Sequence, residues 1–136
     1  MDNLLNCLNK EGFENLKQTY MKSSNEYFDE DTKIRGFETK FKNEYIWLAK
    51  QIYNCSLTGK KEFSAVHMTR FGLEIIPKVT EVFTATFADL GIQLTYLKFG
   101  SFQPLWFVEW NSNTKFFEII NNDNSLFYMN LITCKN

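Results

Sequence analysis

The spacing of apolar residues changes at Gly91, and this change constrains the fold of the 136-residue chain more than any other feature. Before Gly91, apolar residues recur every three or four positions, which is the period of an amphipathic helix. After Gly91, short segments rich in β-branched and aromatic residues alternate with connections rich in Asn, Ser and Gly, which is typical of strands. Helices first and strands last indicate an α+β fold.

Three helices are predicted in the N-terminal part of the chain, over about residues 2–22, 32–54 and 64–90. The first contains Gly12, which weakens a helix interior, so the spacing fits either one weakened helix or two shorter ones. The second has one narrow apolar stripe, which indicates that a single face is buried. The stripe consists of Ile34, Phe37, Phe41, Tyr45, Leu48 and Ile52. Asp31 or Thr32 is its expected N-cap.

The third predicted helix contains Pro77, a residue that removes a backbone hydrogen bond inside a helix. The apolar spacing keeps the same phase on both sides of Pro77, and Ser64 is a suitable N-cap. We therefore predict one helix over 64–90 with a kink near Pro77. The alternative is a new helix that begins with Pro77 in its first turn, where proline is well tolerated.

Four strands are predicted in the C-terminal part, over about residues 92–99, 105–110, 115–120 and 126–133. Because the connections between them are short, neighbouring strands should pair antiparallel as a meander. The predicted fold is therefore α+β, a single domain over residues 1–136. About three N-terminal helices pack on a C-terminal four-stranded antiparallel β-meander.

Both faces of this predicted sheet are rich in apolar side chains. Helices packed on one side would cover only one face, so the other requires a second helix layer, a protein partner, a second copy of the chain or a ligand. Aromatic side chains dominate binding hot spots, which favours an interaction surface on the sheet. The candidate interface residues are Trp106, Trp110, Tyr128, Phe107 and Phe116.

Few residues are candidates for catalysis. Glu109 and Glu118 fall in mid-strand on the same predicted face, where apolar surroundings can raise a carboxyl pKa for acid–base work. The alternative is that both mark a wet rim of the sheet. His67 is the only histidine. It falls on a predicted helix face with Arg70 and Glu74, which indicates a solvated, salt-bridged surface; a role as general base is the alternative.

Metal and cofactor chemistry has little support in the sequence. Cys7, Cys55 and Cys134 are widely spaced and form no CxxC pair, and one histidine is too few to complete a zinc site with them. The segment Thr58-Gly59-Lys60-Lys61 lacks the upstream glycine and the following Ser or Thr of a phosphate-binding loop. We predict no metal site and no cofactor.

Charge and hydropathy argue against two classes of partner. The net charge of −1 exerts no long-range attraction on nucleic acid or on an anionic membrane. Binding of single-stranded nucleic acid by base stacking is a weaker alternative. No segment approaches the roughly 18 apolar residues of a membrane helix, and the N-terminal residues lack the pattern of a signal peptide. We expect an intracellular protein, cytoplasmic or nuclear, that is not secreted.

The sequence therefore predicts a small non-enzymatic protein, an accessory or inhibitor-type factor that acts through an aromatic sheet surface. Its partner would be another protein or a second copy of the chain, with a homodimer through the sheet as the simplest form. Enrichment in Lys, Asn and Phe, which have A/T-rich codons, indicates the A/T-rich genome of a virus, phage, protist or low-GC bacterium. We expect the protein to be encoded by a virus or a mobile element. The alternative is a ligand-binding or enzymatic α+β domain with a pocket between helices and sheet, lined by Glu109, Glu118 and His67.

Overall fold

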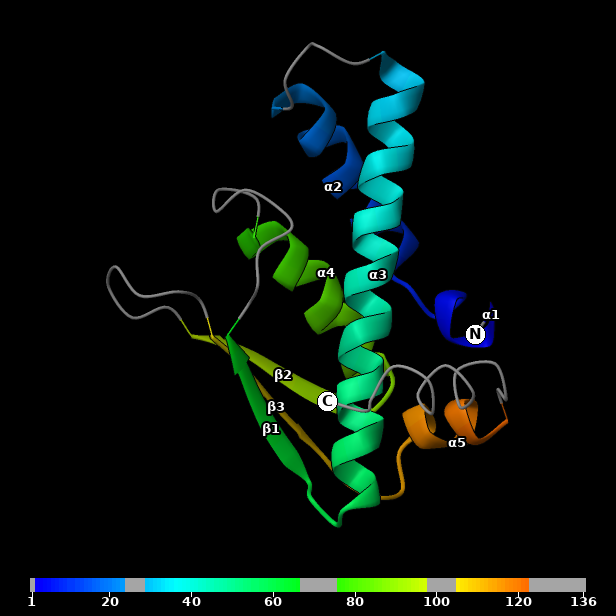
Figure 1. The fold of residues 1–136 in the computed structure, drawn as a ribbon, viewed down its shortest axis with the longest axis vertical. Helices are drawn as coiled ribbons and strands as arrows, with labels where there is room; N and C mark the ends of the chain where they lie inside the picture. Colours follow the sequence, from blue (N-terminus) through cyan, green and yellow to red (C-terminus); the bar gives the residue numbers. More distant parts are fainter. Residues whose placement is uncertain (1, 24–28, 67–75, 98–104, 123–136) are drawn as a thin grey trace.

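A computed structural model of the protein describes residues 2–23, 29–66, 76–97 and 105–122. Within these ranges the chain forms five helical segments and three strands (Figure 1). The helices are α1 (Asp2–Leu5), α2 (Lys10–Ser23), α3 (Glu30–Leu57), α4 (Ile76–Asp89) and α5 (Lys115–Asn121). The strands are β1 (Glu62–Val66), β2 (Ile92–Leu97) and β3 (Leu105–Trp110).

The three strands form one antiparallel sheet in the order β1-β3-β2, so β3 is central and β1 and β2 form its edges. The register places Phe107 of β3 between Ser64 of β1 and Thr95 of β2. The predicted α+β class and antiparallel pairing are confirmed. The predicted four-stranded meander is wrong, because one strand of the sheet comes from the N-terminal half of the chain and one predicted strand is a helix.

The predicted strand over 115–120 is helix α5 in the structure. Its apolar run fits both a strand and a buried helix, and periodicity alone does not separate the two. Thr114 holds the N-cap position in an extended conformation, and the helix buries Phe116, Phe117 and Ile120. The N–H of Phe116 donates to the carbonyl oxygen of Leu90, 3.0 Å away, which ties the start of α5 to the end of α4. The predicted strand over 126–133 lies outside the described residues.

The predicted helix over 64–90 is also wrong, because its first residues belong to β1 and α4 begins only at Ile76. Ser64, expected to cap a helix, instead lies opposite Phe107 in the sheet. Pro77 is exposed in the first turn of α4, where a missing N–H costs no intrahelical bond. The alternative of a new helix that begins near Pro77 agrees with the bounds of α4. Residues 67–75, on the N-terminal side of the predicted kink, lie outside the described residues.

The predicted helix over 2–22 is two helices, and the break precedes Gly12 rather than falling on it. The side-chain Oδ1 of Asn9 accepts a hydrogen bond from the N–H of Gly12 at 3.0 Å, which caps the start of α2. The N–H of Asn9 donates to Oγ1 of Thr86 on α4 at 3.0 Å. Asn9 therefore caps the start of α2 and also holds it against α4.

The predicted helix over 32–54 is confirmed as α3, and it is longer than expected. Its N-cap is Asp29 rather than Asp31 or Thr32: the carboxylate of Asp29 accepts a hydrogen bond from the N–H of Thr32 at 2.7 Å. Hydrogen bonds from Thr32 hold the pKa of Asp29 below its usual value. The apolar stripe of α3 faces the core as predicted, with Ile34 half-buried.

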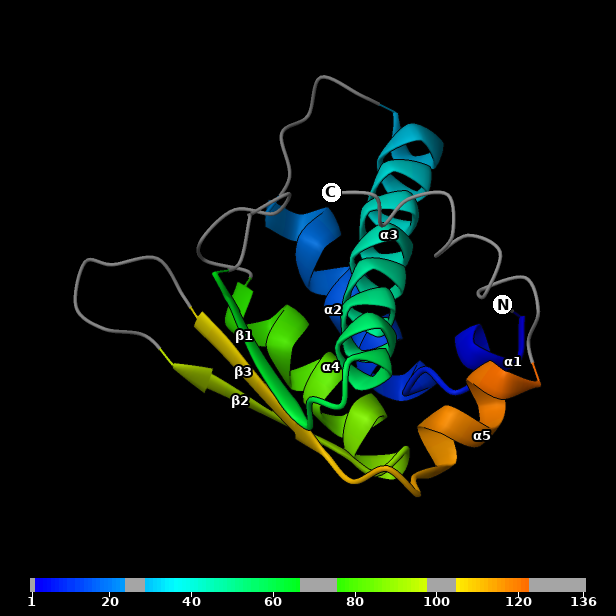
Figure 2. The ribbon, with the colours of Figure 1, turned by 60° about the horizontal axis from the view of Figure 1, so that its bottom comes forward.

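The core lies where α3, α4 and one face of the sheet meet (Figure 2). The rings of Phe41 and Phe83 are 4.8 Å apart, and Phe83 meets Trp106 edge to face at 5.7 Å. The hydroxyl of buried Tyr45 donates to the carbonyl oxygen of Leu4 at 2.9 Å, which fixes α1 on α3. Burial raises the pKa of Tyr45 far above its usual value. Aromatic rings from three layers therefore form one continuous core.

Candidate interaction surface

Three of the five candidate interface residues lie in the core and not on a surface. Trp106 and Phe116 are fully buried, and Trp110 is 5% exposed. The indole Nε1 of Trp106 donates to Oγ1 of Thr80 on α4 at 3.0 Å, and the ring of Trp110 lies 6.3 Å from that of Phe63 on β1. These contacts occupy the side chains within one subunit. Trp106, Trp110 and Phe116 are therefore part of the core and not of an exposed sheet surface.

Phe107 points to the opposite side of β3 from the two tryptophans. Burial alternates along β3, with Trp106, Val108 and Trp110 buried and with Leu105, Phe107 and Glu109 half-buried. This alternation follows from the two-residue period of a strand. Helices α3 and α4 pack against β1 and β2 from the side of the tryptophans. No described element covers the other side, which we call the outer face (Figure 2). The fifth candidate, Tyr128, lies outside the described residues.

Three rows of side chains cross the outer face. The central row is Ser64, Phe107 and Thr95, and an apolar row beside it pairs Leu105 with Leu97. Ser64 is exposed, and Phe107, Thr95, Leu105 and Leu97 are half-buried. The centre of the outer face is therefore an apolar patch around Phe107, with short hydroxyl side chains on either side.

The third row of the outer face is acidic. Glu62 of β1 lies directly opposite Glu109 of β3, and Gln93 of β2 lies on the other side of Glu109. Like charges directly opposite each other destabilise a strand pair by roughly 0.2–1 kcal/mol. Among the described residues, neither carboxylate forms an ion pair. The row is thus a concentration of negative charge that no cation among the described residues pairs with.

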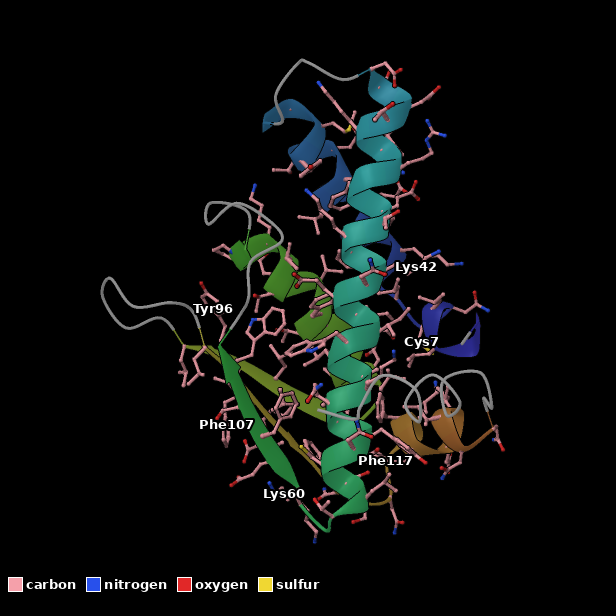
Figure 3. All side chains as sticks on the ribbon, viewed as in Figure 1. Cys7, Lys42, Lys60, Tyr96, Phe107 and Phe117 are labelled. Atoms are coloured by element: carbon pink, nitrogen blue, oxygen red, sulfur yellow. The ribbon has the colours of Figure 1, made fainter. Side chains whose placement is uncertain are left out.

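A hollow of about 590 Å³ lies at this end of the outer face, beside the turn from α3 into β1. Its lining includes Lys60 and Lys61 of the turn, Glu62 and Ser64 of β1, and Phe107 of β3. Figure 3 shows Lys60 at the turn and Phe107 along the sheet. The hollow therefore joins the apolar patch to the acidic row and to two exposed lysines.

The two candidate catalytic carboxylates, Glu109 and Glu118, lie on different elements. Glu109 is half-buried on the outer face, and Glu118 is exposed on α5, so the predicted strand-to-strand pair of carboxylates does not exist. His67 lies outside the described residues. Within the described ranges, no group of three or more His, Cys, Asp or Glu side chains is arranged to hold a metal ion. Cys7 and Cys55 are half-buried cysteines.

Two further hollows lie between helices, away from the sheet. One of about 350 Å³ separates α2 from α4 and is lined by Asn15, Lys78 and Glu81 among others. Another of about 260 Å³ lies between the end of α3 and α5, where Tyr53 and Phe117 form part of its wall. The space between the sheet and α4 is occupied by core side chains such as Trp106 and Phe83, which does not favour a ligand pocket there.

Sequence reasoning missed β1, and with it Glu62 and Ser64 of the outer face. The residues were assigned to a helix, because Ser64 followed by a regular apolar spacing resembles a helix start. The available signal was the alternation in Glu62-Phe63-Ser64-Ala65-Val66, which is also that of a half-buried strand.

The chain was compared with protein-family models, with curated proteins and with solved structures, and none of the three comparisons found a match. Among the described helices, none combines the length and the apolar character that crossing a membrane requires.

Proposed function

We propose that this protein is a small non-enzymatic interaction factor, of accessory or inhibitor type, that binds a protein partner through the outer face of its sheet. The observation that supports this proposal is the half-buried Phe107 at the centre of a face that no described element covers. Aromatic side chains at the centre of an apolar patch are the usual anchors of protein interfaces. Intracellular location and a viral or mobile-element origin stay predictions from composition.

The chemistry of the outer face defines the kind of partner that fits it. Phe107 and Leu105 call for apolar side chains that exclude water from the patch. Glu62 and Glu109 face each other across the strand pair, and a Lys or Arg of the partner placed between them would relieve their repulsion. We therefore propose a partner that presents an apolar ridge with a basic side chain at one end.

The same features give less support to the other candidate functions. Phosphate groups would meet the paired carboxylates of Glu62 and Glu109, which disfavours binding of nucleic acid to the outer face. An acid–base site needs two groups within reach of one substrate, whereas Glu109 and Glu118 lie on the sheet and on α5. Protein binding is the function that uses both the apolar patch and the acidic row.

Affinity capture with matched variants tests the proposal. The wild type, Phe107→Thr and Trp47→Ala are immobilised and exposed to an extract of the cells that make the protein. Trp47 is a suitable control because it is 36% exposed on α3, away from the sheet. Removal of a central aromatic anchor costs about 2 kcal/mol or more of binding free energy, so Phe107→Thr should retain the partner at least roughly tenfold less well, and Trp47→Ala should retain it fully.

The charge of the acidic row provides a second test. Glu62→Lys should weaken capture of the same protein, and Glu118→Lys on α5 should leave it unchanged. If Phe107→Thr and Glu62→Lys retain every captured protein at the wild-type level, the outer face is not the binding surface.

A further inference from the structure

The two edges of the sheet differ in chemistry. Strand β2, Ile92-Gln93-Leu94-Thr95-Tyr96-Leu97, contains no charged residue and no proline. Strand β1 begins with exposed Glu62. Lysines flank both edge strands in the sequence, because Lys60 and Lys61 precede β1 and Lys98 follows β2. Proteins protect open edge strands with charges, prolines or bulges, because an open edge pairs with other strands. Within its own bounds β2 has no charge and no proline, and its short, β-prone sequence is of the type that pairs readily.

The hydrogen-bond pattern identifies which backbone groups of β2 are open. The N–H of Trp110 on β3 donates to the carbonyl oxygen of Lys61 at 2.9 Å, so Trp110 directs its backbone groups toward β1. Bonding direction alternates along an antiparallel strand, so Glu109 and Phe107 direct theirs toward β2. Their partners Gln93 and Thr95 therefore bond to β3. The alternate residues of β2 have their N–H and C=O groups directed away from the sheet. These residues are Ile92, Leu94 and Tyr96.

No strand among the described residues pairs with this edge. The geometry points to a second copy of the same chain as its occupant. We propose that β2 pairs antiparallel with β2 of another subunit about a two-fold axis, which joins two three-stranded sheets into one of six strands. A two-fold contact places the same surface on both sides. Each copy then offers the other an alternating row of donors and acceptors, with no charged side chain to repel it.

Helix α4 is compatible with a second copy at this edge. It packs on β2, so pairing at the β2 edge brings the α4 helices of both subunits toward each other. The hydroxyl of Thr80 on α4 contacts Trp106 of the sheet. Thr84 and Ala88 come four and eight residues later, so they lie on nearly the same side of the helix. They lie on the flank away from Val82 and Thr86, which adjoin α2. Both side chains are small, so this flank permits close approach of a neighbouring helix.

Measurement of molecular mass by sedimentation velocity, over a wide range of protein concentration, tests the proposal with two matched variants. Ser64 and Thr95 flank Phe107 in the same row of the outer face, one on each edge strand. A lysine on an edge strand discourages pairing at that edge. The wild type and Ser64→Lys should be dimers, and Thr95→Lys should be monomeric or dimerise at least roughly tenfold more weakly.

Any other result of this experiment overturns the proposal. A wild type that stays monomeric at the highest soluble concentration has no self-pairing edge. Equal dimerisation of Thr95→Lys and Ser64→Lys shows that the contact does not involve β2. Loss of dimer in both variants indicates association through the outer face, since both lysines lie beside Phe107. Because the partner capture described above depends on Phe107 and Glu62, its result is independent of whether β2 pairs.

A second pair of variants tests the backbone ladder itself. Tyr96→Ala and Tyr96→Pro both remove the phenol side chain, but only proline also removes the N–H that points out of the edge. Tyr96→Ala should keep the dimer, and Tyr96→Pro should lose it with a circular dichroism spectrum like that of Tyr96→Ala. Equal dimerisation of the two variants would overturn the proposal. If Tyr96→Pro does not fold, Thr95→Lys decides the question.

Discussion

The two faces of the sheet use the same strand for different purposes. On the inner face, Trp106, Val108 and Trp110 are enclosed by α4 and the core. On the outer face, the alternate residues Leu105, Phe107 and Glu109 are half-buried and no described element lies over them. The larger aromatic residues are thus the structural ones. The comparison teaches that position in the two-residue alternation separates core from surface in this strand, with both tryptophans on the core side.

The largest expected difference between the two faces is in stability. Trp106→Ala should lower the free energy of unfolding by about 3–5 kcal/mol, because it leaves a large cavity beside Phe83. Phe107→Ala should lower it by less than about 1.5 kcal/mol, because its side chain loses only partial burial. Urea unfolding followed by circular dichroism measures both. Equal losses would show that the outer face is packed as tightly as the inner one.

A smaller effect is expected from the polar contact that supports the inner face. Thr80→Val removes the hydroxyl that accepts from the buried indole N–H of Trp106, which should cost about 1–3 kcal/mol. Thr84→Val, one turn later on α4 and only half-buried, should change stability by less than about 0.5 kcal/mol. Thermal unfolding of the two variants sharpens the comparison. Similar melting temperatures would mean that the indole has another acceptor.

Relief of charge on the outer face should stabilise the protein slightly. Glu62→Gln removes the repulsion with Glu109 across the strand pair and should raise the free energy of unfolding by about 0.2–1 kcal/mol at low ionic strength. The gain should shrink as salt screens the wild-type repulsion. Glu118→Gln on α5 is the control with no expected gain. A loss of stability in Glu62→Gln would contradict an unrelieved acidic row.

The local spacing of apolar residues was sufficient to predict β3 with its alternation and, separately, the apolar stripe of α3. The sheet topology was not predictable in this way. Strand β1 exists through its pairing with β3, which lies far along the chain, and that pairing overrides the helical spacing around Ser64. Helix α5 was missed because two adjacent phenylalanines and two isoleucines fit either period. In the helix, the ring of Phe116 packs on Phe87 of α4. This tertiary contact is not visible in the local sequence.

The candidate site was predictable in part for the same reason. The alternation along β3 already separated Phe107 and Glu109 from the tryptophans. It did not say which set faces the helices, since that depends on where α4 packs. The acidic row required knowledge of β1, because Glu62 comes next to Glu109 only through strand pairing.

Residue-resolved oxidative footprinting of the isolated protein tests most directly whether β3 divides an enclosed face from an open one. Brief exposure of dilute protein to hydroxyl radicals, followed by tandem mass spectrometry of the peptide that contains β3, reports the solvent access of each side chain. After correction for intrinsic reactivity, Leu105 and Phe107 should be oxidised readily and Trp106 and Trp110 should be protected. Oxidation of Trp106 at a rate equal to or above that of Phe107 would contradict the account.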